Sequence, residues 1–183
     1  MSNHPQAAIH YRITPVDPYA HLFAVELQIQ QPGPDQLLRL PAWIPGSYMI
    51  RDFARNIVSI DASDSNGAVS LTKLDKSTWQ LGHCRGPVSI RYQVYAWDLS
   101  VRAAHLDQKH AYFNGTSVFL EVVGQGDRPC TVDIDNATIP EARHWRVATS
   151  LPEAGAARYG FGRYRAENYD DLIDHPVEIA DVS

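Results

Sequence analysis

The stretches Ile9-His10-Tyr11-Arg12-Ile13 and Phe23-Ala24-Val25-Glu26-Leu27-Gln28-Ile29 decide the fold class, because large apolar residues occupy every second position in both. A period of two places those side chains on one face of a β-strand and their neighbours on the opposite face. The chain therefore opens with two half-buried strands. Their apolar face needs a second layer to cover it.

The same pattern continues along the chain. Further runs typical of strands are residues 57–60, 69–74, 78–81, 88–97, 118–123, 131–134 and 145–148. Clusters of Gly, Pro, Asn and Asp separate them, and only residues 48–53 and 166–175 could be helical. The sequence predicts an all-β domain, either an antiparallel β-sandwich or a saddle-like two-sheet domain, with at most one or two short helical turns.

Composition limits the domain count and the kinds of partner. The 183 residues are 44% hydrophobic and carry a net charge of −5, which gives no reason to expect nucleic acid as a partner. No apolar run approaches the roughly 20 residues that span a bilayer, and residues 1–6 do not resemble a signal peptide, so we expect a cytoplasmic protein without a membrane partner. Residues 166–183 contain six acidic residues and no Lys or Arg. We therefore expect a β domain over residues 1–165 and an acidic linker over 166–183.

Self-contained chemistry is missing from the sequence. There is no HExxH zinc motif, no GxSxG nucleophile motif and no GxxxxGK[ST] phosphate loop. Cys84 and Cys130 are far apart, which favours unpaired thiols. His105 and His110 bracket a loop and His175 lies near Glu178, but isolated histidines are usually structural. We predict no catalytic residue, no metal site and no cofactor in this chain.

Two binding functions remain as alternatives. Residues 158–165 interleave arginines with aromatic residues, as RNA-recognition strands do, although the two helices of such a domain are not indicated. A carbohydrate-binding β-sandwich would use an exposed Trp43, Trp97 or Trp145 to stack on a sugar.

One segment combines three aromatic residues with a Pro-Gly turn within eleven residues: Trp43-Ile44-Pro45-Gly46-Ser47-Tyr48-Met49-Ile50-Arg51-Asp52-Phe53. Pro45 fixes φ and Gly46 tolerates a positive φ, so the chain can reverse sharply and present Tyr48 and Arg51 in a set direction. A corner of a β-sandwich with a buried Trp would use the same residues. The segment alone leaves both interpretations open.

Together with Val94-Tyr95-Ala96-Trp97-Asp98-Leu99-Ser100-Val101-Arg102 and His110-Ala111-Tyr112-Phe113-Asn114-Gly115, this segment resembles the N-terminal region of the glycyl aminopeptidase family of zinc metallopeptidases. The resemblance runs from about residue 9 to residues 174–178. It implies a non-catalytic domain that packs on its own catalytic domain and helps to wall the substrate cleft. It also implies that the catalytic domain, absent from this chain, binds zinc through HExxH and a distant glutamate and acts on peptide N-termini, preferring glycine. The chain alone is expected to be inactive.

The candidate cleft or domain-interface residues are Tyr48, Arg51, Asp98, Arg102, Asn114 and Gly115. Asn114-Gly115 suits a two-residue hairpin turn between residues 111–113 and 117–120, with Asn114 as a polar tip that either contacts the cleft or only makes the turn. For the pairs Arg51–Asp52 and Asp98–Arg102 we expect hydrogen-bonded structural or interface roles, because close opposite charges usually satisfy one another.

Overall fold

The computed structural model describes residues 7–41, 53–98 and 103–181. These residues form fifteen strands and four short helical segments, which confirms the all-β prediction. The helical segments are η1 (Phe53–Asn56), α1 (Gly115–Val118), η2 (Pro140–Ala142) and α2 (Tyr169–Ile173).

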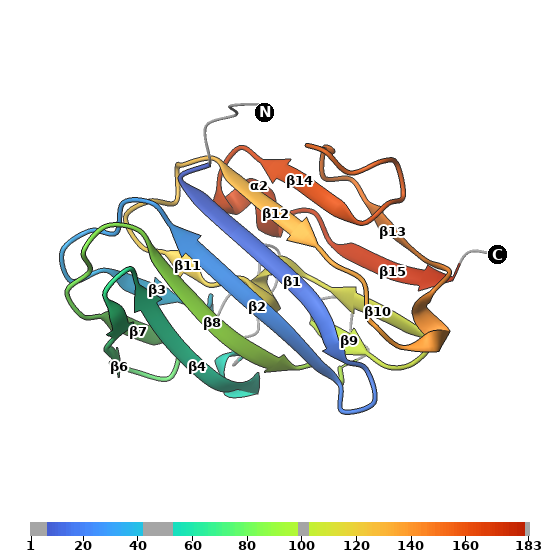
Figure 1. Ribbon diagram of the computed structural model, residues 1–183, viewed down its shortest axis with the longest axis horizontal. Coiled ribbons are helices and arrows are strands. Elements are labelled where there is room, and N and C mark those ends of the chain that lie inside the picture. The colour runs from blue at the N-terminus through green and yellow to red at the C-terminus, as the bar shows by residue number, and fades with distance from the viewer. Residues whose placement is uncertain (1–6, 42–52, 99–102, 182–183) are drawn as a thin grey trace, which may run out of the picture.

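A large seven-stranded sheet forms one layer, in the order β14-β12-β1-β2-β8-β4-β5 (Figure 1). Its strands are β14 (Gly162–Ala166), β12 (Cys130–Ile134), β1 (Ile9–Asp17), β2 (Leu22–Ile29), β8 (Val88–Tyr95), β4 (Ile57–Asp64) and β5 (Gly67–Val69). Neighbours are antiparallel except β1 and β12, which run parallel with Ile9 beside Cys130. The two predicted opening strands thus lie at the centre of the largest sheet.

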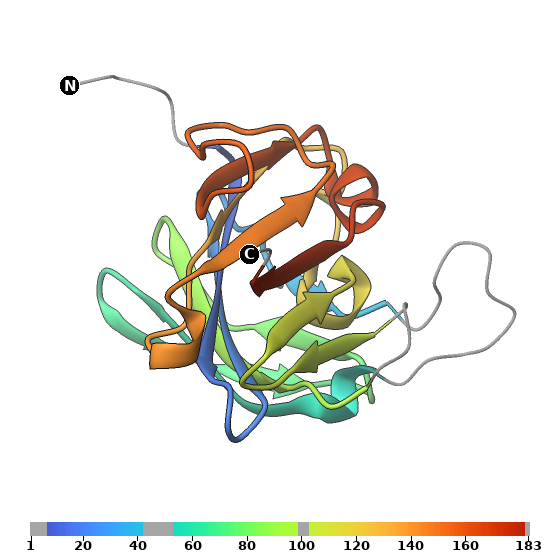
Figure 2. The ribbon, with the colours of Figure 1, turned by 90° about the vertical axis from the view of Figure 1, so that its right-hand side faces the viewer.

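Two smaller sheets share the hydrophobic core with the large sheet, and the C-terminal one is seen beside it in Figure 2. The C-terminal sheet has the order β13 (Trp145–Thr149), β15 (Val177–Asp181), β10 (His110–Phe113) and β9 (Ala104–Leu106). The other has the order β11 (Glu121–Val122), β3 (Leu37–Arg39), β7 (Thr78–Leu81) and β6 (Leu71–Lys73). The expected second layer is therefore divided in two, and the predicted strand at 69–74 is divided between β5 and β6.

The core follows from the alternation in β1, β2 and β8. Ile9, Tyr11 and Ile13 are buried, and so are the matching alternate residues of β2 and β8. Phe23 of β2 meets Phe113 of β10 edge-on, with ring centroids 5.6 Å apart, which joins the large sheet to the C-terminal one. Burial of a large apolar side chain is worth about 1.5–3 kcal/mol, so this face of the large sheet provides much of the stability.

The acidic tail is part of the fold, in contrast to the predicted linker. β15 pairs with both β10 and β13, and its Val177 and Ile179 are buried. Before it lies α2, shorter than the predicted helix and capped by the Asn168 side chain, which accepts from the Asp171 amide. The acidic residues face outward while apolar residues between them complete the sheet. Residues 166–181 therefore belong to the β domain, and the boundary predicted at residue 165 is wrong.

The hairpin predicted at Asn114-Gly115 is also wrong. Asn114 starts the helical turn α1, and the predicted strand 118–123 is reduced to the two residues of β11. Asparagine favours helix N-caps as well as hairpin turns, because its side chain accepts a backbone hydrogen bond in both. Of the helix predicted at 48–53, only Phe53 falls in the described residues, where it begins η1.

Candidate domain-interface site

Residues from two of the three sequence motifs, and a residue that follows the third, line one cavity of about 360 Å³. Its lining residues come from η1, from the end of β8 and the residues after it, from the start of β9, and from α1. They are Phe53, Arg55, Asn56, Val94, Tyr95, Trp97, Asp98, Ala103, Ala104 and Ser117. Phe53 ends the first motif, residues 94–98 open the second, and Ser117 follows the third. The fold therefore brings together segments that are widely separated in sequence.

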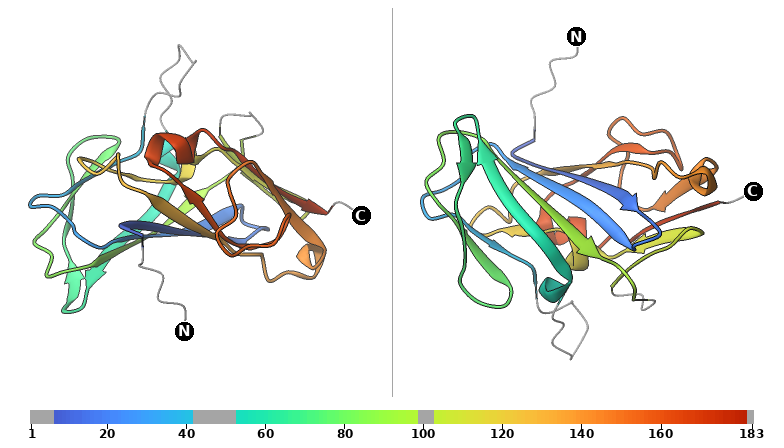
Figure 3. Two further views of the ribbon diagram at one scale, coloured as in Figure 1. Left: turned by 90° about the horizontal axis from the view of Figure 1, so that it is seen from above. Right: turned by 60° about the horizontal axis from the view of Figure 1, so that its bottom comes forward.

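The rim of the cavity is aromatic. Trp97 is 54% exposed, and Tyr95 is exposed beside it. The Trp97 ring lies against the imidazole of His21, with centroids 4.1 Å apart, and against that of His105 at 4.9 Å. Backbone hydrogen bonds join the residues after β8 to β9, including Leu106 N to Ala96 O at 2.9 Å. Figure 3 shows the end of β8 beside the β9–β10 hairpin. Trp97 is thus a surface residue with a fixed orientation.

Asn114 lies next to this cavity and organises α1. Its Oδ1 accepts from the Thr116 amide at 3.1 Å and from Thr116 Oγ1 at 2.7 Å. Its backbone amide donates to Ala103 O at 2.9 Å, and its carbonyl accepts from Ser117 Oγ at 2.6 Å. Among the described residues, no hydrogen bond from Asn114 Nδ2 is found.

Gly115 is required by close packing. A Cβ at this position would lie 3.1 Å from the Ile173 Cα of α2 and 3.2 Å from Phe119 Cδ2. Because one of these neighbours is backbone, it cannot move aside without shifting α2. Gly115 therefore has a structural role, which permits α1 and α2 to touch.

Three buried tyrosines hold the chain that follows α1; we call Tyr11, Tyr92 and Tyr169 the tyrosine clamp. Tyr92 Oη donates to Val118 O at 2.5 Å and accepts from Leu120 N at 3.1 Å. Tyr169 Oη donates to Phe119 O at 2.6 Å. Tyr11 Oη donates to Leu120 O at 2.6 Å.

The clamp explains the irregular backbone after α1. Carbonyl groups of three consecutive residues, 118–120, are satisfied by side chains from three different elements. Burial raises the pKa of all three tyrosines, so their hydroxyls stay neutral donors. A buried segment without strand partners is stable only when its polar groups are satisfied in this way.

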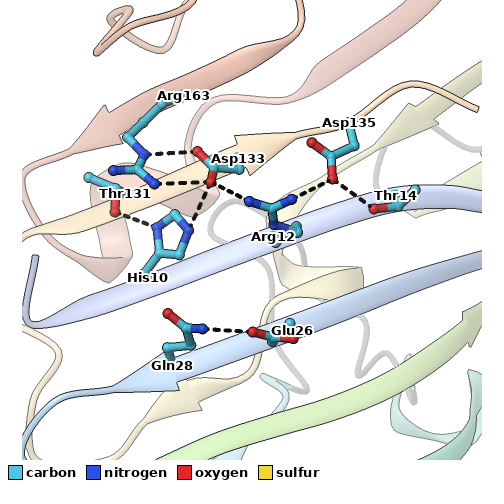
Figure 4. A network of polar contacts seen from close by, with 9 residues as sticks. All are labelled: His10, Arg12, Thr14, Glu26, Gln28, Thr131, Asp133, Asp135 and Arg163. Atoms are coloured by element: carbon cyan, nitrogen blue, oxygen red, sulfur yellow. Dashed lines mark hydrogen bonds and ion pairs between the residues drawn. The ribbon is translucent and has the colours of Figure 1, made fainter. Parts of the chain in front are cut away.

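A second polar cluster lies on the outer face of the large sheet (Figure 4). Asp133 of β12 is 7% exposed and receives Arg163 Nε at 2.8 Å and Arg12 Nη2 at 3.1 Å. Its Oδ2 also lies 3.1 Å from His10 Nε2, while His10 Nδ1 is 2.6 Å from Thr131 Oγ1. We call His10, Arg12, Asp133 and Arg163 the Asp133 network. It ties β14, β12 and β1 together.

The charges of this network satisfy one another. Burial alone would raise the pKa of Asp133, but the hydrogen bond from Arg163 and the neighbouring positive charges lower it. Burial lowers the pKa of His10, so its imidazole is neutral at pH 7, and a proton on Nε2 lets it donate to Asp133. A carboxylate with three donors is a structural anchor rather than a general base.

The structure locates three of the six predicted site residues, and the cleft or interface role of all six stays a prediction. Tyr48, Arg51 and Arg102 lie outside the described residues, as do Asp52 and Trp43, so neither predicted charge pair is described. Asp98 lines the cavity, with its amide donating to Ala104 O at 3.0 Å. Asn114 and Gly115 flank the cavity through α1. Sequence reasoning did not anticipate the tyrosine clamp, because tyrosines at core positions of alternating strands give no signal of what their hydroxyls bind.

The candidate residues of the two alternative binding functions differ in exposure. Trp145 is 4% exposed and cannot stack on a sugar, whereas Trp97 is 54% exposed, as the carbohydrate alternative requires, and Trp43 lies outside the described residues. In the arginine-rich segment, Arg163 is bound to Asp133, and Arg158 lies 5.0 Å from the ring of its neighbour Tyr159. The longest helix among the described residues has five residues, so the helices of an RNA-recognition domain are not present there.

The sequence has no HExxH segment, so it offers no ligand set for a catalytic zinc ion of that type. Both cysteines are free, Cys130 in the core and Cys84 half-buried. None of the helices in the described ranges is long and apolar enough to cross a bilayer.

The fold occurs in known peptidases. An M1 zinc metallopeptidase from Deinococcus radiodurans matches 94% of this chain with a TM-score of 0.54 at 10% identity, and this chain covers 41% of it. An aminopeptidase N family protein from Idiomarina loihiensis matches 94% of the chain at 47% identity with a TM-score of 0.91. This chain spans 29% of that protein. The fold is thus that of a β domain found in an aminopeptidase N family protein and in an M1 zinc metallopeptidase.

The family is shown by a direct match. The family model described as the Peptidase M61 N-terminal domain matches residues 10–181, and the chain belongs to this family. A comparison with curated proteins found no match. The resemblance noted from the three motifs is confirmed, and the match extends through the acidic tail that the sequence analysis had separated.

Proposed function

We propose that this chain is the non-catalytic N-terminal domain of a zinc-dependent aminopeptidase that prefers N-terminal glycine. One observation carries the proposal: the chain is 47% identical, over 94% of its length, to an aminopeptidase N family protein of which it covers 29%. A catalytic domain would hold the zinc ion and the general base. This domain would pack on it and act on peptide N-termini only through it.

The cavity is the proposed contact with the catalytic domain. Aromatic side chains such as Trp97 and Tyr95 are enriched at protein interfaces, where an apolar ring and a polar edge are both used. Asn114 Nδ2 has no partner among the described residues, and the Asn114 backbone is held by the bond of its amide to Ala103 O. An exopeptidase must close its cleft just beyond the substrate terminus, and a rigid polar turn from a neighbouring domain suits this task.

A cytoplasmic location is part of the proposal. Cys84 and Cys130 are both free thiols. Unpaired cysteines are usual in reducing compartments.

The experiment is to express the polypeptide encoded by the whole reading frame and to compare it with the 183-residue chain. The longer protein should hydrolyse a glycyl chromogenic amide in a zinc-dependent manner, and the shorter chain should remain at background. A reading frame that ends without an HExxH segment, or zinc-dependent turnover by the short chain, would overturn the proposal.

The cleft role of Asn114 has its own test in the longer protein. Asn114→Asp keeps the Oδ1 cap but removes the Nδ2 donor, so we expect a higher KM for peptide substrates with unchanged thermal stability. Ser63→Ala on β4, the strand between β8 and the edge strand β5, is the matched control. Equal KM values for all three proteins would show that Asn114 only makes the turn.

A further inference from the structure

The β9–β10 hairpin carries a cluster of two imidazoles and one carboxylate. Asp107 Oδ2 lies 3.1 Å from His105 Nε2, and Asp107 Oδ1 lies 3.5 Å from His110 Nδ1. One ligand atom from each residue lies within 4.8 Å of the other two. The two imidazole rings are stacked, with centroids 4.9 Å apart. In the sequence these residues are spaced His-x-Asp-x-x-His.

The hairpin fixes the carboxylate. Asp107 Oδ1 accepts from the amides of Lys109 at 2.7 Å and His110 at 2.9 Å, which closes the turn. Burial would raise the pKa of Asp107, but these two amides and the His105 imidazole lower it to about 2. The group is therefore ionised throughout the physiological range. Its Oδ2 faces His105 and is not used by the turn.

We propose that His105, Asp107 and His110 form a binding site for a divalent transition metal of the Zn²⁺ type. Imidazole nitrogen and carboxylate oxygen are ligands that Zn²⁺ accepts at about 2.0–2.2 Å, which places neighbouring ligand atoms roughly 3.0–3.6 Å apart. The 3.1 Å separation of His105 Nε2 from Asp107 Oδ2 lies in that range, and His110 Nδ1 lies 3.5 Å from the other oxygen of the same carboxylate, Oδ1. To bind one metal ion, the two imidazole nitrogens must also approach each other. The His110 side chain is 35% exposed and therefore has room to move.

The environment of His105 determines the zinc affinity that we expect. His105 is 3% exposed, and its Nδ1 has no hydrogen-bond partner among the described residues. A cation at Nε2 would place the ring proton on this Nδ1, and metal-binding histidines usually donate that proton to a second group. We therefore expect micromolar rather than nanomolar binding. Three protein ligands also leave a fourth position for water or another ligand.

This site is independent of the proposed catalytic zinc. It uses residues of this chain alone, and it is tested on the 183-residue chain, for which no peptidase activity is expected. A failure here would leave the aminopeptidase proposal untouched, and a failure of the aminopeptidase proposal would not affect this test.

The experiment titrates ZnCl₂ into the untagged chain by isothermal calorimetry. We expect one equivalent of zinc, and at least about tenfold weaker binding for His110→Asn, which removes the most exposed ligand. His175→Asn is the matched control, because His175 Nε2 also lies 3.1 Å from a carboxylate, that of Asp171, but no third ligand is found near it in the part of the chain that the structure describes. It should bind zinc as the natural sequence does.

A second variant and a spectroscopic signal guard against misfolding. Asp107→Asn keeps an oxygen for the two turn amides, so it should fold while losing zinc affinity. Co²⁺ should quench the fluorescence of Trp97, whose ring lies 4.9 Å from that of His105, and Trp97→Phe should remove this quenching. No saturable zinc uptake by the natural sequence, or equal affinities for His110→Asn and His175→Asn, would overturn the proposal.

Discussion

The two faces of the large sheet carry polar groups in opposite ways, although neighbouring residues of β1 supply both. Tyr11 points inward to the tyrosine clamp, while His10 and Arg12 point outward to the Asp133 network. The clamp is neutral, fully buried and bound to backbone. The network is ionic, and its arginine side chains are about half exposed. Neutral hydrogen bonds in the core should therefore govern stability, and surface charge should only adjust it.

The largest effect should follow Tyr92→Phe. The change leaves both Val118 O and Leu120 N buried without their partner, and each such group costs about 1–3 kcal/mol. We expect a loss of about 2–4 kcal/mol in the free energy of unfolding, measured by urea denaturation. Tyr19→Phe is the control, because that hydroxyl meets only Glu141 at the surface, and its effect should stay below about 0.5 kcal/mol. Similar losses for both variants would contradict the comparison.

Gly115→Ala should have the next largest effect. The added methyl group would lie 3.1 Å from the Ile173 Cα, and overpacking of this kind costs about 1–3 kcal/mol. Thermal unfolding measures the loss. Gly126→Ala is a matched control, since a Cβ there would meet only Glu121 Oε1, at 3.8 Å. Unchanged stability of Gly115→Ala would show that α1 and α2 are not tightly packed.

A smaller loss is expected for Asp133→Asn. The amide can still accept from Arg163, but it removes the charge that three neighbours share, and because those arginines are about half exposed the cost should be about 1–2 kcal/mol. Added salt should reduce the difference in the free energy of unfolding between Asp133→Asn and the natural sequence. It should leave the corresponding difference for Tyr92→Phe unchanged. A loss of stability as large as that of Tyr92→Phe would contradict the conclusion that the buried face of the sheet contributes more to stability than the outer face.

The smallest expected effect is on the pH dependence of the free energy of unfolding. Because the pKa of Asp133 is lowered in the folded state, its contribution is complete well above the unfolded value of about 3.9 and is lost as the pH falls through the lower folded value. As the pH falls from about 3.9 through the lower folded pKa of Asp133, the gap in the free energy of unfolding between the natural sequence and Asp133→Asn should therefore shrink toward zero. The difference in the free energy of unfolding between Tyr92→Phe and the natural sequence should stay constant over this acidic range. Burial raises the pKa of Tyr92, so its hydroxyl does not titrate there. Denaturation at pH 7 and at acid pH measures both.

Much of the fold could be predicted from sequence, because period-two alternation reports directly on which face of a strand is buried. The alternation predicts strands at 9–13, 23–29 and 88–97, which correspond to β1, β2 and β8, although β8 ends at Tyr95. The parallel pairing of β1 with β12 could not be predicted, since alternation says nothing about partners. The tail was misjudged because its charges were counted, whereas the apolar Val177 and Ile179 between them determine its place in the sheet.

The site was less accessible to sequence reasoning. Asn114-Gly115 was singled out, but two local structures suit that pair, and contacts from Ile173 and Tyr169 decide between them. Those contacts come from residues more than fifty positions away. The His105, Asp107 and His110 cluster has a readable spacing, yet only the hairpin pairing of β9 with β10 brings its ligand atoms together.

The parallel pairing of β1 with β12 also has a consequence for synthesis. Tyr11 pairs in register with Val132, so the second neighbour of β1 is made 121 residues later. At about 5–20 residues per second, translation leaves that edge of β1 unpaired for roughly 6–24 seconds, long after β2 has been made. An open strand edge invites pairing with other chains. Nascent chains halted before Cys130 are therefore the form of this protein most exposed to aggregation, and the ones that most need a chaperone.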